Sequence, residues 1–136
     1  MFFTIPEFND AGDGHYGWFN PTLDTSVARL YRNGTLVGEV PRLFNARAAV
    51  PAESASYKLT SEVTRTAPWW TMSTALSTAW TFASGHSPGT TYLPLLQVDF
   101  DIAVDTLNRA LPGADFPIQL SVRHQPASQT RPRSLA

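Results

Sequence analysis

The sequence predicts an all-β protein: an antiparallel two-sheet β-sandwich, immunoglobulin- or fibronectin-like, with about seven strands. Three observations support this. Apolar and polar residues alternate with a period of two in several segments. The 11 prolines and 8 glycines of the 136 residues separate the apolar runs and so interrupt long helices. Finally, an Asn-Gly pair stands between two β-prone segments.

That Asn-Gly pair predicts a β-hairpin. A type I′ turn needs positive φ at both central residues, and Asn33-Gly34 suits both positions. We expect its arms at Val27–Arg32 and Thr35–Val40.

Five other segments alternate in the same way, and each is expected to form a half-buried strand. They are FFTIPEF at the start of the chain, SYKLTSEVTRT (Tyr57, Leu59 and Val63 on one face), STAWTFAS (Trp80 and Phe82), YLPLLQVDFDIAV (Leu96, Val98 and Phe100) and DFPIQLSVRHQ (Phe116, Ile118, Leu120 and Val122). The segment DIAVDTLNRALPG fits either a short helix or a strand followed by a loop.

The length and the 43% hydrophobic content suit one domain, expected over residues 1–125. Residues 126–136, PASQTRPRSLA, have no apolar periodicity and are expected to form a flexible tail or linker.

Composition also narrows the expected partners. The net charge of −1 provides no basic surface for nucleic acid, and no apolar run has the roughly 20 residues that cross a bilayer. There is no cysteine, and MFFTIPEF does not have the pattern of a signal peptide. If the protein is exported, we expect it to be part of a larger precursor.

The stretch NDAGDGHYG is a candidate metal site. Asp10 and Asp13 lie close together among glycines, and carboxylate oxygens are ligands that Ca²⁺ prefers. The EF-hand spacing is not met, because Ala11 and Asn20 stand where ligands are required. A solvated turn held by Asx hydrogen bonds is the alternative, and no other cofactor is expected.

Two tryptophans are candidate ligand-binding residues. Trp18 follows the glycine-rich stretch and Trp70 follows Pro68, and aromatic side chains on loops of a β-sandwich can stack on sugar rings. The alternative is packing in the core or against another domain.

GHSPG matches the G-x-S-x-G pattern of a serine nucleophile, and an acidic residue and then His124 follow Ser87. A nucleophile elbow needs a helix after the serine, whereas Pro88 and Gly89 follow here. A small serine hydrolase is therefore only a less favoured hypothesis, and no catalytic residue is assigned.

Six segments in order resemble the C-terminal region of large secreted actinobacterial subtilisin-like serine proteases. They are GDGHYG, ARLYRNGTLVGEV, VPAESASYKLTSEVTR, STAWTFASGH, LPLLQVDFDIAVDTLNRA and FPIQLSVRHQ. The chain departs from that pattern at RLFNARAAVPAE, where a shorter glycine-containing turn is expected.

The resemblance implies a non-catalytic accessory β-sandwich, secreted within a larger precursor whose peptidase domain lies elsewhere. Such a domain stabilises or positions the catalytic domain, or contacts substrate. Its partners would be the other domains of the precursor and a protein or polysaccharide substrate. A carbohydrate- or ligand-binding module of an exported protein is the alternative.

Overall fold

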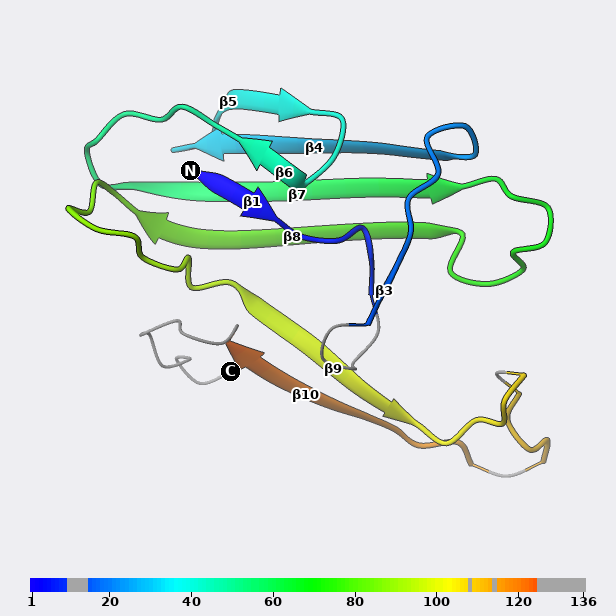
Figure 1. Cartoon of the computed structure of the whole chain (residues 1–136). Helices are drawn as coiled ribbons and strands as arrows, with labels where there is room; N and C mark the ends of the chain where they lie inside the picture. Colours follow the sequence, from blue (N-terminus) through cyan, green and yellow to red (C-terminus); the bar gives the residue numbers. More distant parts are fainter. Residues whose placement is uncertain (10–14, 108, 114, 125–136) are drawn as a thin grey trace.

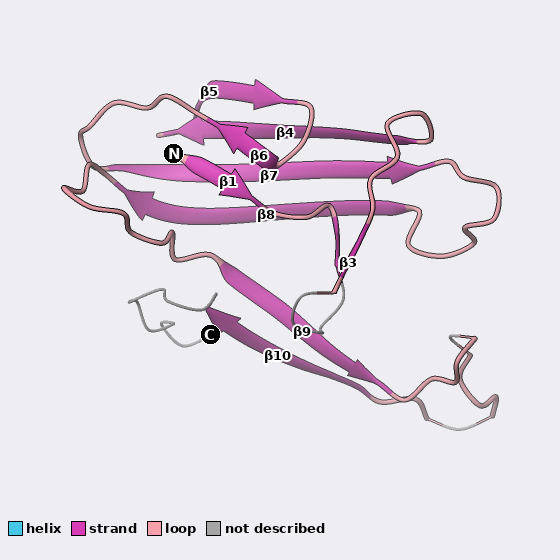
Figure 2. Cartoon of the chain, viewed as in Figure 1, coloured by secondary structure: helices cyan, strands magenta, loops and turns pink. Residues whose placement is uncertain are grey.

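The computed structural model describes residues 1–9, 15–107, 109–113 and 115–124. In these residues the chain forms strands and loops and no helix (Figures 1 and 2). The ten strands are β1 (Phe2–Thr4), β2 (Phe8–Asn9), β3 (Tyr16–Gly17), β4 (Asp24–Arg32), β5 (Thr35–Val40), β6 (Phe44–Arg47), β7 (Ala55–Arg65), β8 (Ala75–Ser84), β9 (Leu96–Ile102) and β10 (Ile118–His124). The all-β prediction is confirmed, but seven strands was too few.

The largest sheet is antiparallel and has the order β5-β4-β7-β8. Its β4–β5 connection confirms the predicted hairpin, because Asn33 and Gly34 both have positive φ (48° and 85°). The predicted strand at SYKLTSEVTRT is β7, which lies between β4 and β8.

One face of this sheet forms the core. Tyr57, Leu59 and Val63 are buried on β7, as their alternation predicts, whereas Lys58 and Glu62 are exposed. The Tyr57 ring stacks on Phe82 of β8, with 5.8 Å between the ring centroids.

A second layer covers part of this face. β1 and β6 pair antiparallel and place Phe3, Leu43 and Ala46 in the same core cluster as β4 and β7 (Figure 1). β6 was not predicted, and it lies within RLFNARAAVPAE, where the chain departs from the protease pattern.

β9 and β10 form a separate antiparallel pair in the lower part of Figure 1, with seven paired positions. Their apolar residues share one face, as predicted. However, Val98, Phe100, Ile118 and Leu120 are 60%, 46%, 55% and 68% exposed. The expected burial is wrong for these four side chains, whereas Leu96, Ile102 and Val122 on the same face are half-buried.

The β9–β10 pair is tied to the main sheet by Trp80, whose indole N–H donates to the carbonyl oxygen of Leu96 at 2.9 Å. Trp80 is half-buried against the core. After β9 the described residues of DIAVDTLNRALPG form turns, so strand followed by loop is the alternative that the structure adopts.

Candidate functional site

Trp18 and Trp70, the two tryptophans singled out in the sequence, line the same cleft. The cleft has a volume of about 880 Å³ and lies beside the β2–β3 pair, the end of β7 and the start of β8. Its aromatic and apolar lining includes Tyr16, Trp18, Trp69, Trp70, Met72 and Phe100. We refer to it as the aromatic cleft.

These side chains are unusually open to solvent. Trp18 is 81% exposed, Trp69 69% and Trp70 49%, and Tyr16 is also exposed. Contiguous exposed aromatic residues are uncommon on a folded domain unless something binds to them. The lining therefore has the character of a binding surface.

Arg65, the last residue of β7, joins the two predicted tryptophans. Its Nη2 group donates to the carbonyl oxygen of Trp18 at 2.9 Å. Its guanidinium lies over the ring of Trp70, 4.9 Å from the centroid, and over the ring of Phe8 at 3.5 Å. A single arginine thus contacts the ring of Trp70 and the backbone of Trp18.

Asp24 in turn holds Arg65. The Arg65 Nε atom lies 3.1 Å from the Asp24 carboxylate, and the two side chains are only 8% and 1% exposed. Asp24 and Arg65 face each other across β4 and β7, and the Asn20 backbone N–H also donates to this carboxylate at 2.7 Å. A buried, hydrogen-bonded pair of this kind fixes the position of the guanidinium.

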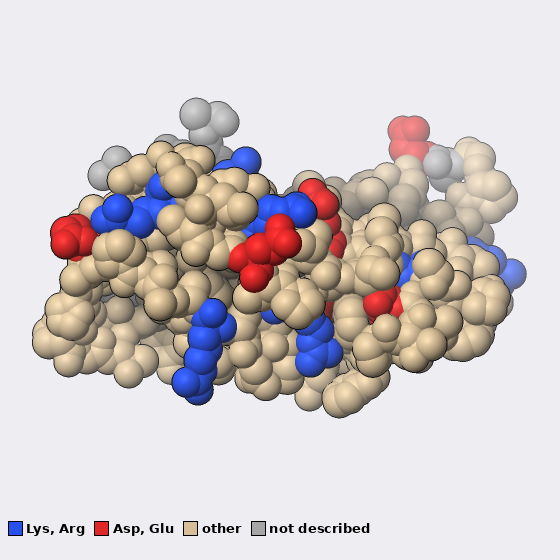
Figure 3. Space-filling view, turned by 90° about the horizontal axis from the view of Figure 1, so that it is seen from above, with Lys and Arg blue, Asp and Glu red and all other residues tan. Residues whose placement is uncertain are grey.

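The electrostatics of the cleft follow from this pair. Because Asp24 balances Arg65, the base of the cleft has no net charge. A different face, seen from above in Figure 3, also shows Lys and Arg interspersed with Asp and Glu and no large patch of one sign. The cleft therefore suits a neutral ligand that offers flat apolar surfaces.

The predicted calcium ligands Asp10 and Asp13 lie outside the described residues. The strands on either side of them, β2 and β3, pair antiparallel. In the described part of the chain, no three His, Cys, Asp or Glu side chains come together as a metal site would require.

Ser87 and His124 are not connected by any hydrogen bond in the described part of the chain. Ser87 follows β8 in an irregular segment, and no helix begins after it. Asp99 accepts a hydrogen bond from Arg123 at 2.6 Å, and both ring nitrogens of His124 are buried without a described partner. These residues therefore do not form an assembled catalytic triad, as the hypothesis of a serine hydrolase requires.

No protein-family model, curated protein or solved structure matched this chain. In the described part of the chain, no helix is long and apolar enough to span a membrane.

Sequence reasoning identified Trp18 and Trp70 but missed Arg65. A signal was present, because the alternation that buries Leu59 and Val63 also places Arg65 on the buried face of the same strand. A buried cation requires a partner, so Arg65 marked a charged pair before its partner was known.

Proposed function

We propose that this chain is a non-catalytic accessory β-sandwich domain of a secreted subtilisin-like serine protease, and that its aromatic cleft contacts substrate. The observation that carries the second part is the aromatic cleft itself, with its exposed tryptophans. Arg65, which Asp24 fixes, contacts the ring of Trp70 and the backbone of Trp18 there. The first part depends on the resemblance of the six ordered segments.

The cleft supports contact rather than chemistry. Indole rings stack on the apolar faces of sugar rings and of proline, and prior positioning of the rings reduces the entropy lost on binding. Among ligands of this kind we favour a neutral polysaccharide chain, because successive sugar rings can stack on separated tryptophans. A carbohydrate-binding module of another exported protein is the alternative that shares this site.

Intrinsic tryptophan fluorescence tests the cleft. Oligosaccharides from cellulose, chitin and xylan, and an unfolded casein, are titrated into the chain. We expect a saturable change with at least one probe, lost in Trp70→Ala and retained in the control Leu36→Ala, which removes an exposed apolar side chain of β5 outside the cleft. The same response in Trp70→Ala, or none with any probe, contradicts a substrate-contacting cleft.

Whether the precursor contains a peptidase domain is tested separately, by sequencing the open reading frame that encodes this chain. A subtilisin-like peptidase domain in the same frame supports the accessory role in a protease. An open reading frame with a different catalytic domain, but with sugar binding retained, favours the alternative module.

A second accessory role is favoured by the β9–β10 pair. Its exposed residues Val98, Ile118 and Leu120 lie outside the cleft and form an apolar face that another domain of the same precursor would cover. If it does, joining that domain protects the β9 and β10 amides from hydrogen exchange. Unchanged exchange excludes this role and leaves the aromatic cleft untouched.

A further inference from the structure

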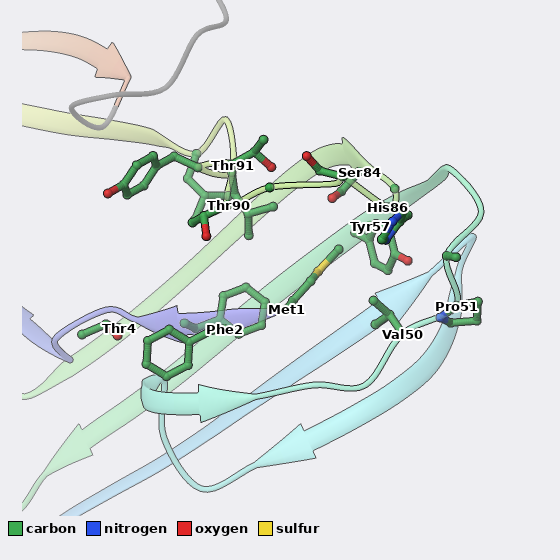
Figure 4. A pocket seen from close by; sticks show the side chains of 18 of the residues that line it. Met1, Phe2, Thr4, Val50, Pro51, Tyr57, Ser84, His86, Thr90 and Thr91 are labelled. Atoms are coloured by element: carbon green, nitrogen blue, oxygen red, sulfur yellow. The ribbon is translucent and has the colours of Figure 1, made fainter.

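A second cavity, of about 790 Å³, shares no lining residue with the aromatic cleft. It is bounded by β1, by the loop with Val50 and Pro51, and by the segment between β8 and β9 (Figure 4). Figure 4 shows Phe2 and Thr4 on one side and Thr90 and Thr91 on the other. We refer to it as the β1 cavity.

β1 presents a free backbone edge to this cavity. Met1 and Ala48 exchange two hydrogen bonds, and the Ile5 N–H donates to Leu43, so the odd-numbered residues face β6. The N–H and C=O groups of Phe2 and Thr4 therefore point the opposite way. Within the described residues they have no hydrogen-bond partner, since β1 pairs only with β6 there.

The Tyr57 hydroxyl is a second unused group. Tyr57 is 1% exposed and lines the β1 cavity, yet its hydroxyl oxygen is buried without a hydrogen-bond partner among the described residues. A buried polar group without a partner is unfavourable. A bound segment that offers a polar atom at this position would remove that cost.

The charge of the β1 cavity restricts that partner. None of its lining side chains is Asp, Glu, Lys or Arg. Phe3 points inward beside Leu95, whereas Phe2 points outward and is 55% exposed. A strand added beside β1 would likewise place alternate side chains in the cavity and outside it.

We propose that the β1 cavity binds an extended, uncharged peptide segment of a partner protein, which adds to β1 as a further strand. Its backbone would pair with Phe2 and Thr4, and a polar atom would reach the Tyr57 hydroxyl. Addition of a strand to an exposed edge is an established mode of peptide recognition. This inference concerns a surface separate from the aromatic cleft and does not depend on the proposed function.

The probe is the capped peptide acetyl-Thr-Val-Thr-Val-Thr-Val-amide, titrated into ¹⁵N-labelled protein at up to millimolar concentrations. We expect saturable shifts of the Phe2 and Thr4 amide signals and slower hydrogen exchange at both. Binding with no shift in β1, or no binding at all, overturns the proposal.

Two variants test the backbone pairing. Thr4→Pro removes the N–H that faces the cavity and no described bond within the fold, so we expect binding about fivefold to tenfold weaker with an unchanged melting temperature. Thr4→Ala keeps the N–H and is the matched control. Equal binding by both variants overturns the proposal.

Tyr57→Phe tests the hydroxyl, and we expect binding about threefold or more weaker. The competing occupant is a second copy of this chain. Sedimentation velocity distinguishes it: a dimer that Thr4→Pro dissociates would overturn the partner segment as occupant, whereas a monomer at all concentrations agrees with it.

Discussion

The four-stranded sheet β5-β4-β7-β8 and the β9–β10 pair share one sequence pattern but differ in how far their apolar faces are buried. Both alternate apolar and polar residues, and both form regular antiparallel ladders. Leu59 in the sheet is 1% exposed, whereas Leu120 in the pair is 68% exposed. Alternation thus specifies a strand with one apolar face, but another element has to cover that face.

The β1–β6 pair covers the sheet over Leu30, Tyr57 and Leu59, and these residues form one cluster with Phe3 and Leu43. The β9–β10 pair contributes little to that cluster. The two regions therefore predict effects of different size for the same type of substitution. The first two of the four predictions below test that difference, and the other two test a turn of the sheet and the loop between β9 and β10.

The largest expected effect is on ion pairs. Asp24→Asn breaks the buried pair with Arg65 and should lower the free energy of unfolding by about 3–5 kcal/mol. The equivalent change in the β9–β10 pair, Asp99→Asn, breaks a partly exposed pair with Arg123 and should lower it by about 1 kcal/mol or less. Urea unfolding followed by circular dichroism measures both. Equal effects would contradict the contrast between the regions.

Truncation of leucine comes next. Leu59→Ala should lower the free energy of unfolding by about 2–5 kcal/mol, because it leaves a cavity in a packed core. Leu120→Ala removes an exposed side chain and should change it by less than about 0.5 kcal/mol. A large effect of Leu120→Ala would show that its face is covered in solution.

A smaller effect concerns the turn between β4 and β5. Gly34 has φ of 85°, so Gly34→Ala should destabilise the sheet by about 1–2 kcal/mol. Gly38 lies in β5 with open space around its Cα, so Gly38→Ala is the control and should change stability by less than about 0.5 kcal/mol. Thermal unfolding measures the stability of both variants. An equal loss in Gly34→Ala and Gly38→Ala would show that the positive φ of the turn is not the cause.

The smallest effect lies in the connection between β9 and β10. Hydrogen bonds from the Arg109 side chain and backbone hold the pKa of Asp105 below its ordinary value of 3.8. A lowered folded pKa means that the contact is fully present above pH 3.8 and is lost as the pH falls through the lower value. The NMR signal of the Arg109 amide should shift with that titration, and the shift should be absent in Asp105→Asn. A midpoint at or above 3.8 would contradict the contact.

Local rules account for most of what the sequence predicted correctly. The positive φ at Asn33 and Gly34 depends on those residues alone, and the buried face of β7 follows from its alternation. β6 was missed because Phe44–Arg47 has only four residues, too few for a pattern to stand out.

The aromatic cleft was predictable only in part. Trp18 and Trp70 stood out as aromatic residues near turn signals, but nothing local indicated that Arg65 would join them. That contact needs the β4–β7 register, which places Asp24 opposite Arg65. The free edge of β1 and the unpaired Tyr57 hydroxyl likewise depend on which strands come to lie together.

The amino-acid sequence by itself determined that this protein is built from antiparallel strands, where its clearest turn lies, and which residues share a face. The tertiary structure decided which of those faces are buried, that a single arginine joins two distant tryptophans, and which strand edge stays free. The reason is physical: backbone conformation and alternation act over a few residues, whereas burial and pairing depend on segments far apart in the chain.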